Sequence, residues 1–396
     1  MSKGKFFIEP WIDENGWNKD EFKKLETPCY VVDEKRLEDN LRILAEVRQR
    51  AGIKIMMALK GFAMHSLFPI IEKYLDGVAA GSLYEAKLGA EKFKGEIEVF
   101  APAYFDQEIK ELSEIADHLI FNSFGQWKKY GPDLRKNKRK ISFGIRVNPE
   151  HREVETDLYD PAGKYSRLGV RADNFKDQSL DGISGLHFHT LCEHNADAFE
   201  RTLKVFEEKF GKFLAKMEWV NFGGGHHLTR KDYDLDLFYK TINGFIKRYP
   251  HLRIYIEPGE AITLNIGVLV GTVLGIVNNE KDVAILDVSA HNHMPDVLAM
   301  PYWPQALGGG LEGKYEYNYR FGGLTCLAGD IIGDYSFPKP LKVGDKIVFM
   351  NQAHYTMVQT STMCGVGLPS IAVRKKSGEI KIIKKFGYED FKNRLS

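Results

Sequence analysis

Cysteine is scarce in this chain, and the few cysteines form no pattern. Four occur in 396 residues, and they are Cys29, Cys192, Cys326 and Cys364. No two of them stand in a C-x-x-C pair, which argues against a disulfide framework and against a structural zinc site. The scarcity fits a reducing compartment. We therefore predict a cytoplasmic location and no bound metal.

An excess of charge of either sign is also absent. Lysine and arginine together number 55 and aspartate and glutamate 54, for a net charge of +1. This balance gives no electrostatic reason to expect a nucleic acid or an acidic membrane as a partner. No apolar leader segment opens the chain, because Glu9, Asp13 and Glu14 interrupt it. The long uncharged runs at 261–279 and 355–373 contain Gly, Thr, Ser or Asn and indicate strands and turns rather than a membrane span.

What is present is a soluble composition, 43% hydrophobic and 28% charged, in a chain long enough for two domains. Between residues 55 and 257, about eight apolar β-type runs alternate with helical periodicity. This alternation predicts a (β/α)₈ TIM-type barrel over residues 34–264, although a doubly wound parallel sheet fits the same pattern. We expect Asp33 to cap a helix at 34–51, another helix at 66–76 and a strand at 183–189.

After Pro258 the helical periodicity largely disappears. The runs at 268–277, 283–288 and 346–350 are rich in β-branched residues and separated by Gly, Asn and Asp. We predict a β-sandwich or β-barrel domain over residues 265–396, which residues 1–33 join.

Polar or glycine-rich groups follow many of the apolar runs in the first domain. They are Lys60, Gly81-Ser82, Asn122-Ser123, Arg146, His187 with His189, Gly223–Gly225 and Glu257–Glu260. In (β/α)₈ barrels the chemistry sits at the carboxyl ends of the strands, where all of these would converge. A lysine held there can be desolvated, lose its proton and form a Schiff base. The commoner role of a lysine that ends a strand is to return to water.

Each of the other groups also has a plain structural interpretation. Gly223–Gly225 could approach a phosphate through backbone N–H groups or simply form a tight turn, and Leu228 rules out a dinucleotide fingerprint. His187 and His189 share a strand face, but no carboxylate–histidine pattern accompanies them, so a zinc site is not favoured. Cys326 lies in a glycine-rich loop, where a thiol can act as an acid, yet most cysteines are small buried hydrophobes.

Taken together, these motifs resemble the fold type III (alanine-racemase-like) pyridoxal-phosphate decarboxylases, the family of the ornithine, arginine and diaminopimelate decarboxylases. In chain order the matching motifs are T-P-C-Y-V (27–31), A-L-K-G (58–61), G-S-L-Y-E (81–85), H-F-H (187–189), N-F-G-G-G (221–225), E-P-G-E (257–260), G-L-T-C (323–326) and A-H-Y-T (353–356). The runs at 293–304 and 326–335 are similar to the branch that decarboxylates carboxynorspermidine and carboxyspermidine to norspermidine and spermidine in polyamine biosynthesis.

The resemblance implies a role for each matching position. Lys60 would carry the pyridoxal 5′-phosphate, His189 would stack on its ring, and Glu257 would hold the protonated ring nitrogen, which keeps the ring an electron sink. Cys326 would protonate the carbanion after CO₂ leaves. The remaining cofactor-binding positions would be Gly224, Gly225 and Tyr355 at the phosphate, with Glu85 and Arg146 supporting the pocket. In this family the loop cysteine reaches the partner protomer's barrel, which implies an obligate homodimer with shared active sites.

Three departures from the family pattern bear on the phosphate pocket and the substrate. Glu260 replaces the usual Arg after E-P-G, Leu327 replaces the acid that follows the loop cysteine in ornithine decarboxylases, and Leu191-Cys192 replaces a Gly-Ser pair. These changes argue against ornithine. A carboxylated triamine carries ammonium groups along its tail, for which Glu260, Asp296 and Asp330 are the candidate partners, although Glu260 could instead brace a turn.

Two alternatives remain. One is a diaminopimelate or other basic amino-acid decarboxylase of the same family. The other is a non-catalytic paralogue that regulates a decarboxylase, against which the presence of both Lys60 and Cys326 speaks.

Overall fold

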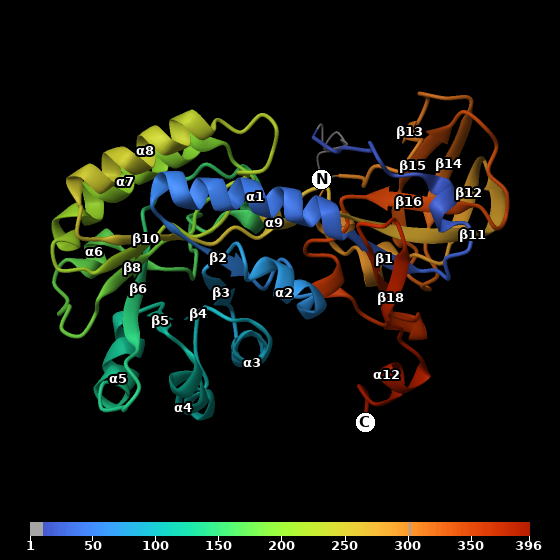
Figure 1. The fold of residues 1–396 in the computed structure, drawn as a ribbon. Helices are drawn as coiled ribbons and strands as arrows, with labels where there is room; N and C mark the ends of the chain where they lie inside the picture. Colours follow the sequence, from blue (N-terminus) through green and yellow to red (C-terminus); the bar gives the residue numbers. More distant parts are fainter. Residues whose placement is uncertain (1–10, 301) are drawn as a thin grey trace. The chain divides into compact units, whose positions relative to one another are not determined.

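The computed structural model describes residues 11–300 and 302–396. Two compact units make up the chain. Unit 1 is Met1–Leu37 together with Thr263–Ser396, and unit 2 is Glu38–Ile262; Figure 1 labels the elements of each. Within the described ranges, no helix combines the length and the apolar character that crossing a membrane requires.

Parallel strands close into a ring in unit 2. In order around the ring they are β2 (Lys54–Ala58), β3 (Gly77–Ala80), β4 (Glu96–Phe100), β5 (His118–Phe121), β6 (Ser142–Asn148), β8 (Gly185–His187), β9 (Trp219–Asn221) and β10 (Arg253–Ile256). The ring closes where Tyr255 of β10 lies opposite Lys54 of β2. A short strand, β7 (Val170–Arg171), pairs with β6 outside the ring. The predicted (β/α)₈ barrel is confirmed, and the doubly wound sheet is excluded.

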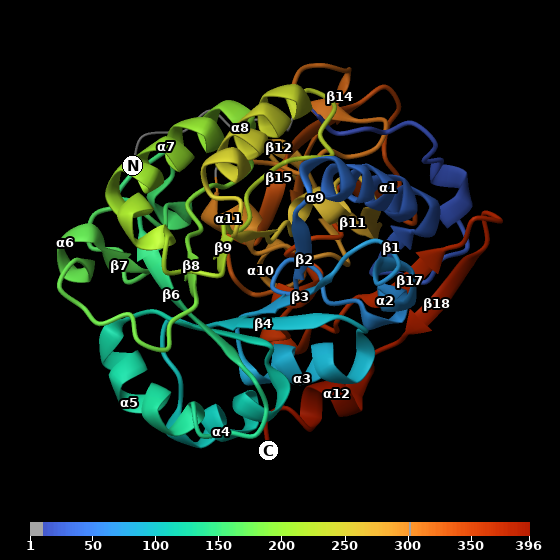
Figure 2. The ribbon, with the colours of Figure 1, turned by 60° about the vertical axis from the view of Figure 1, so that its left-hand side comes forward.

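Helices cover the outside of this barrel, as Figure 2 shows. The long ones are α1 (Glu34–Ala51), α3 (Leu83–Lys92), α4 (Asp106–Ile115), α5 (Phe124–Leu134), α7 (Ala196–Leu214) and α8 (Leu235–Arg248), and the short ones are α2 (Phe68–Ile71), α6 (Ala172–Phe175) and α9 (Glu260–Thr263). Side-chain oxygens cap several of their first turns. Asp33 accepts the Arg36 N–H at 2.8 Å, which confirms the predicted cap of α1.

The secondary structure differs from the sequence expectation in three places. The helix expected at 66–76 is only α2, preceded by a 3₁₀ turn at His65–Leu67, because the following N–H groups of Lys73 and Tyr74 bond three residues back instead of four. Helix α5 was not expected, since Pro132 interrupts its pattern, yet it buries Phe124 and Trp127. The strand expected at 183–189 is shortened to β8.

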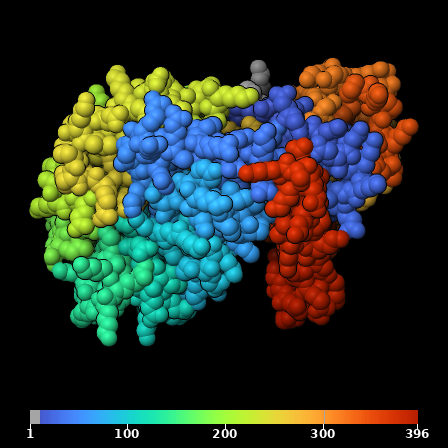
Figure 3. All heavy atoms as spheres, viewed as in Figure 1, coloured from blue at the N-terminus to red at the C-terminus, as the bar shows by residue number. Residues whose placement is uncertain are grey.

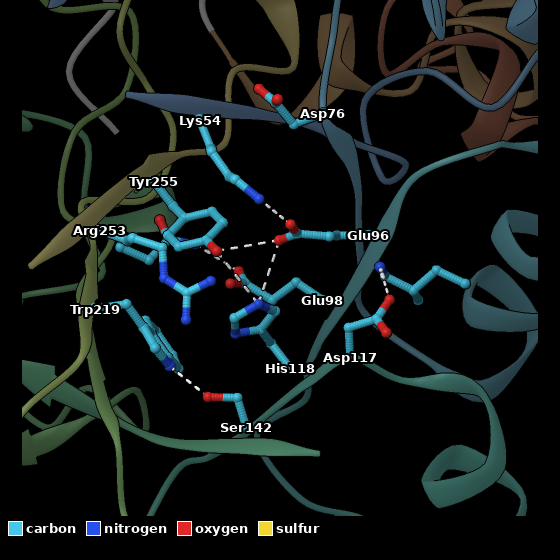
Figure 4. Close-up of polar contacts among 12 residues, drawn as sticks. Lys54, Asp76, Glu96, Glu98, Asp117, His118, Ser142, Trp219, Arg253 and Tyr255 are labelled. Atoms are coloured by element: carbon cyan, nitrogen blue, oxygen red, sulfur yellow. Dashed lines mark hydrogen bonds and ion pairs between the residues drawn. The ribbon is translucent and has the colours of Figure 1, made fainter. Parts of the chain in front are cut away.

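The barrel interior is polar at the amino ends of its strands (Figure 4). The Glu96 carboxylate accepts a hydrogen bond from the Tyr255 hydroxyl at 3.1 Å, lies 3.4 Å from His118 Nε2, and pairs with the Lys54 ammonium group. The Trp219 indole donates to Ser142 Oγ at 2.7 Å. Every second residue of a strand faces the barrel axis. Residues at alternate positions of one strand therefore share the barrel interior, and Glu96 at the amino end of β4 lies on the same face as Glu98 two residues further on.

Unit 1 is built on a second sheet of nine strands. They are β1 (Cys29–Asp33), β11 (Gly267–Asn279), β12 (Lys281–Leu286), β13 (Gly310–Leu311), β14 (Tyr317–Gly322), β15 (Ile331–Phe337), β16 (Lys346–Met350), β17 (Ser370–Arg374) and β18 (Ile380–Lys384). Strand β1 pairs with β11 and β17, which confirms that the N-terminal stretch joins the β domain. Buried apolar residues pack on this sheet, among them Tyr30 and Phe349.

Short helices and the C-terminal segment complete unit 1. The helices are α10 (Ala290–His293), α11 (Asp296–Ala299) and α12 (Tyr388–Lys392), and 3₁₀ turns lie at Lys19–Phe22, Met357–Gln359 and Met363–Gly365. The C-terminal residues, red in Figure 3, lie on the surface, and Tyr388 and Leu395 are exposed there.

Candidate active site

Lys60 lies just beyond the carboxyl end of β2, where the barrel fold places its chemistry. The turn is fixed on both sides, since Leu59 N–H donates to Ala79 O at 3.0 Å and Gly61 N–H to Ala58 O at 3.1 Å. The side chain is accessible to solvent, yet protein atoms crowd its ammonium group. Burial therefore lowers the pKa of Lys60, and the charge of Glu257 opposes this. A lysine of this kind is a better nucleophile than a free one.

Arg146, His187 and Phe100 form the wall of the site from neighbouring strands. The Arg146 guanidinium lies 4.5 Å from the Phe100 ring centroid, and the His187 ring stacks on the same phenyl ring at 5.5 Å. Arg146 is anchored by a hydrogen bond from Nη2 to the His189 carbonyl at 3.0 Å. Burial lowers the pKa of Arg146 to about 10, against the attraction of Glu257, so the guanidinium is charged at neutral pH.

Glu257 is held by two neighbours. Its Oε1 lies 3.0 Å from His187 Nε2 and accepts from Asn221 Nδ2 at 2.7 Å. Burial lowers the pKa of His187, although Glu257 opposes the effect, so the imidazole is neutral. For Glu257 burial favours the neutral form, but hydrogen bonds from His187 and Glu98 outweigh burial and hold the pKa of Glu257 well below its usual range. Glu257 is therefore a carboxylate at the end of β10.

The glycine loop after β9 passes too close to its neighbours for any side chain. Gly223 and Gly225 have φ of +68° and +84°, and a Cβ on Gly225 would lie 2.1 Å from the Leu191 carbonyl. A Cβ on Gly224 would lie 2.4 Å from the Glu257 carbonyl. The Gly224 N–H donates to His189 Nδ1 at 2.7 Å. This bond orients the His189 ring, and burial lowers the pKa of His189 well below its usual range.

Two further predicted residues of unit 2 are engaged in local contacts. Glu260, the first residue of α9, is buried and lies 3.2 Å from His227 Nε2. Glu85 accepts the Gly81 N–H at 2.7 Å, while its own N–H donates to Ser82 Oγ at 3.3 Å. Glu85 thus stabilises the first turn of α3.

In unit 1, Cys326 lies in the loop between β14 and β15. Its thiol is exposed, and its Sγ lies 3.1 Å from the Sγ of Cys364. Cys364 has a left-handed backbone, with φ of +60°. The hydrogen bond between the thiols raises the pKa of Cys326. The pKa of Cys364 is lowered by the Cys326 backbone N–H, which donates to Cys364 Sγ at 3.4 Å, and then by the Cys326 thiol.

Asp330 braces the Cys326 loop. Its carboxylate accepts from Ser289 Oγ at 2.9 Å, from Thr325 Oγ1 at 2.7 Å and from the Thr325 N–H at 3.1 Å. Asp296 is half-buried at the start of α11, and Tyr355 has φ of +56° with its ring near His354. Asp296, Asp330 and Tyr355 all belong to unit 1.

Comparisons with known proteins point to one family. The model of the family described as "Pyridoxal-dependent decarboxylase, C-terminal sheet domain" matches residues 29–353. A carboxynorspermidine/carboxyspermidine decarboxylase of Campylobacter jejuni is 42% identical over 93% of this chain and 98% of its own. A carboxyaminopropylagmatine decarboxylase of Synechocystis is 44% identical over 94% of this chain and 96% of its own. The chain belongs to the pyridoxal-dependent decarboxylase family.

Solved structures agree. One is the crystal structure of carboxynorspermidine decarboxylase complexed with norspermidine from Campylobacter jejuni, which is 41% identical and has a TM-score of 0.86. The match covers 93% of this chain and 100% of that chain. A diaminopimelate decarboxylase from Helicobacter pylori, complexed with L-lysine, shares the fold, with a TM-score of 0.80 at 19% identity. That match covers 95% of this chain and 99% of the other. The predicted family, enzyme class and pyridoxal phosphate cofactor are thereby confirmed.

The residues at the carboxyl end of the barrel fit that cofactor. An amine of lowered pKa, at Lys60, interacts with the charges of Glu257 and Arg146. Glu257 is a buried carboxylate beside a neutral His187, which suits a protonated ring nitrogen. The Gly223–Gly225 loop lacks the side chains that would block a phosphate. Together these features match the donor set that the cofactor of this decarboxylase requires.

Three residues of these clusters were missed in the sequence. They are Asn221, which donates hydrogen bonds to both Glu98 and Glu257, Glu98 itself, and Cys364, which contacts Cys326. An acid between apolar residues of a strand, as in E-I-E-V-F at 96–100, was the available signal for Glu98. Within the described ranges, ligand atoms of Glu98, His187 and Glu257 also lie within 4.8 Å of one another, close enough for a metal ion. The Asn221 N–H bonds to both carboxyl groups account for this spacing without a metal.

Proposed function

We propose that this decarboxylase acts on carboxynorspermidine, carboxyspermidine or both, and yields norspermidine or spermidine in polyamine biosynthesis. The observation that carries the proposal is the 42% identity over 93% of the chain to a carboxynorspermidine/carboxyspermidine decarboxylase. The crystal structure of a 41% identical relative contains norspermidine, the corresponding triamine product.

In this proposal the residues of unit 2 bind and orient the cofactor. Lys60 Nζ would hold it covalently until substrate binds. His189 lies against its ring, and Glu257 holds the proton at its ring nitrogen. The Gly223–Gly225 loop binds the phosphate, with the Gly225 N–H as the donor because the Gly224 N–H already donates to His189 Nδ1, and Glu85 and Arg146 support the pocket. When bound, the cofactor supplies the electron sink for loss of CO₂.

Cys326 is the proposed general acid. A general acid must carry its proton at the working pH. The hydrogen bond to Cys364 raises the pKa of Cys326, which keeps the thiol protonated. The proton on Sγ then passes to the carbon that has lost CO₂, and a thiolate is left. Solvent can return the proton because the thiol is exposed.

Three acids are proposed to bind the ammonium groups of the substrate tail. Glu260 stands where relatives carry arginine, and Asp296 and Asp330 belong to motifs of the triamine branch. A charged hydrogen bond that is removed from water is worth roughly 1.5–3 kcal/mol. Glu260 already contacts His227, so its alternative role is to brace α9. Glu260→Gln separates the two roles, because lost substrate binding lowers kcat/KM for triamines without lowering stability.

We further propose a cytoplasmic homodimer in which Cys326 reaches the barrel of the partner. The support is the family resemblance, together with the exposure of Cys326. Mixing Lys60→Ala with Cys326→Ala, each inactive alone, tests this. Random exchange would restore about a quarter of the wild-type activity, since half of the dimers regain one intact site of two. Absence of any recovery, with subunit exchange proven, would exclude shared sites.

A second substrate is favoured by a separate observation. The Synechocystis relative, 44% identical, is a carboxyaminopropylagmatine decarboxylase. That compound ends in a guanidinium group instead of an ammonium group, and carboxylates bind both. Identity alone therefore does not rank the two classes of substrate.

The deciding experiment is kcat/KM on carboxynorspermidine, carboxyspermidine, carboxyaminopropylagmatine, diaminopimelate and ornithine. We expect a carboxylated triamine to be preferred by orders of magnitude. Diaminopimelate as the best substrate would refute the proposal, and turnover of none would favour the regulatory paralogue. Borohydride should fix the cofactor to the peptide that contains Lys60, and a Lys60→Ala protein with full activity would refute the role of Lys60.

A further inference from the structure

Glu98 is a second buried carboxyl group directly beside Glu257. It lies on β4, two residues beyond Glu96 and on the same face, and it is 1% exposed. Figure 4 shows it close to His118 in the barrel interior. Its Oε1 accepts from Asn221 Nδ2 at 2.5 Å, and no donor among the described residues reaches its Oε2, which leaves that oxygen able to carry a proton.

One amide nitrogen joins the two carboxyl groups. Asn221 Nδ2 donates to Glu98 Oε1 and also to Glu257 Oε1, at 2.7 Å. The orientation of this amide is set by the Gly223 N–H, which donates to Asn221 Oδ1 at 2.7 Å. The Nδ2 group therefore faces both acids. Two carboxyl groups packed this closely, with no cation between them, cannot both be charged, so the pair shares one proton.

The proton belongs on Glu98. Glu257 has His187 at 3.0 Å, and it interacts with the cations Lys60 and Arg146. Among residues 11–300 and 302–396 no ion pair of Glu98 with a cation is found, and Glu98 lies two residues from Glu96 on the same strand face. In agreement, burial and the charge of Glu257 raise the pKa of Glu98 well above its usual range, whereas that of Glu257 is lowered.

We propose that Glu98 is a positioning residue of this site, a neutral carboxylic acid whose O–H donates to the Glu257 carboxylate. Acting through Glu257, it keeps a second proton, the one between Glu257 and the cofactor's ring nitrogen, on that nitrogen. The proposal rests on the proposed role of Glu257 as the partner of that nitrogen.

The physical reason lies in the basicity of Glu257. Hydrogen bonds donated to a carboxylate make it a weaker base. A proton between a carboxylate and a pyridine nitrogen stays on the more basic partner. Without the Glu98 donor, Glu257 becomes more basic and draws the proton away from the ring, which weakens the electron sink.

Several strands around the pair contribute a group that could influence its titration. These groups are Glu96 of β4, His118 of β5, Arg146 of β6, His187 and His189 of β8, Tyr255 of β10, and Lys60 after β2. A pH profile therefore has to be compared between variants rather than assigned to one group.

The test compares Glu98→Gln with Glu98→Leu. Glutamine reproduces the neutral acid, because its oxygen accepts from Asn221 and its N–H₂ donates to Glu257, whereas leucine does neither. Glu46→Gln, which removes an exposed carboxylate of α1 that pairs with Arg50, is the control. The first readout is the absorbance spectrum of the bound cofactor against pH, and the second is kcat/KM.

We expect the spectra and kcat of Glu98→Gln to stay close to wild type, within about threefold. Glu98→Leu should shift the pH midpoint of the spectral transition and lower kcat roughly tenfold or more. The control should leave the spectral midpoint unchanged. If Glu98→Gln behaves like Glu98→Leu, Glu98 is not a neutral donor and the proposal is overturned.

A third readout separates this proposal from the role of Glu257. Thermal unfolding of the full-length protein is measured between pH 5 and pH 8, with and without added cofactor. Folded wild type keeps a proton on Glu98 that the unfolded chain releases, so wild type should lose stability relative to Glu98→Gln as the pH rises. A flat difference overturns the neutral acid. If the slope is present but Glu257→Gln leaves the spectrum unchanged, only the role of Glu257 fails.

Discussion

Replacing Glu96 by glutamine should destabilise the barrel at neutral pH and lose its effect in acid. Glu96 begins β4 at the amino end of the barrel, where it contacts Lys54, His118 and the Tyr255 hydroxyl (Figure 4). Burial favours its neutral form, but hydrogen bonds from His118 and Lys54 outweigh burial and lower its pKa from 4.5 to about 2. The charged form of Glu96 is therefore stabilised by folding.

The size of the effect follows from that pKa. A fall from 4.5 to about 2 corresponds to about 3.4 kcal/mol, at about 1.36 kcal/mol for each pH unit. The side chains of Glu96 and Lys54 are 27% and 33% exposed, so water screens part of this interaction. We expect a loss of about 2 kcal/mol, between the values for surface pairs and for broken buried pairs.

The pH dependence has a definite sign. Because folding lowers the pKa of Glu96, its contribution is complete above the unfolded value of 4.5 and is lost as the pH falls toward 2. Urea unfolding followed by tryptophan fluorescence, from pH 7 to pH 3, measures this. Glu46→Gln, which removes an exposed partner of Arg50, is the control and should cost under about 0.5 kcal/mol. Equal losses for Glu96→Gln at both ends of the pH range would refute the reasoning.

Two other predictions concern packing and thiol chemistry. Gly185→Ala should destabilise the protein by about 1–3 kcal/mol, because the new Cβ would lie 1.9 Å from the Trp219 ring. The control is Gly275→Ala, which has open space around its Cβ and should not destabilise the protein. Equal melting temperatures of the two variants would contradict this prediction. Oxidised glutathione should form a disulfide between Cys326 and Cys364, whose Sγ atoms lie 3.1 Å apart. The two thiols together lose two protons and two electrons, and the oxidised glutathione is reduced to two molecules of glutathione. Peptide mass spectrometry detects the link, and recovery of the Cys326 and Cys364 peptides unlinked after this treatment would exclude the pairing.

Much of the architecture could be predicted because it is encoded locally. Alternating apolar runs and helical periodicity suffice for a (β/α)₈ barrel, and a side-chain cap such as Asp33 needs only the next few residues. Lys60 and Glu257 were identifiable because both end strands, and all parallel strands of a barrel end at one face. Helix α5 was missed because Pro132 disrupts its local pattern, although burial of Trp127 stabilises it in the fold.

The sequence by itself determined the family, the cofactor and the residues that stand at strand ends, because each depends on short motifs whose order is preserved along the chain. Only the tertiary structure decided what lies beneath those ends. Glu98 and Asn221 are 123 residues apart, and they meet because the ring closes. Cys326 and Cys364 meet across 38 residues in unit 1. A buried acid takes its protonation state from such neighbours, and the chain order does not contain them.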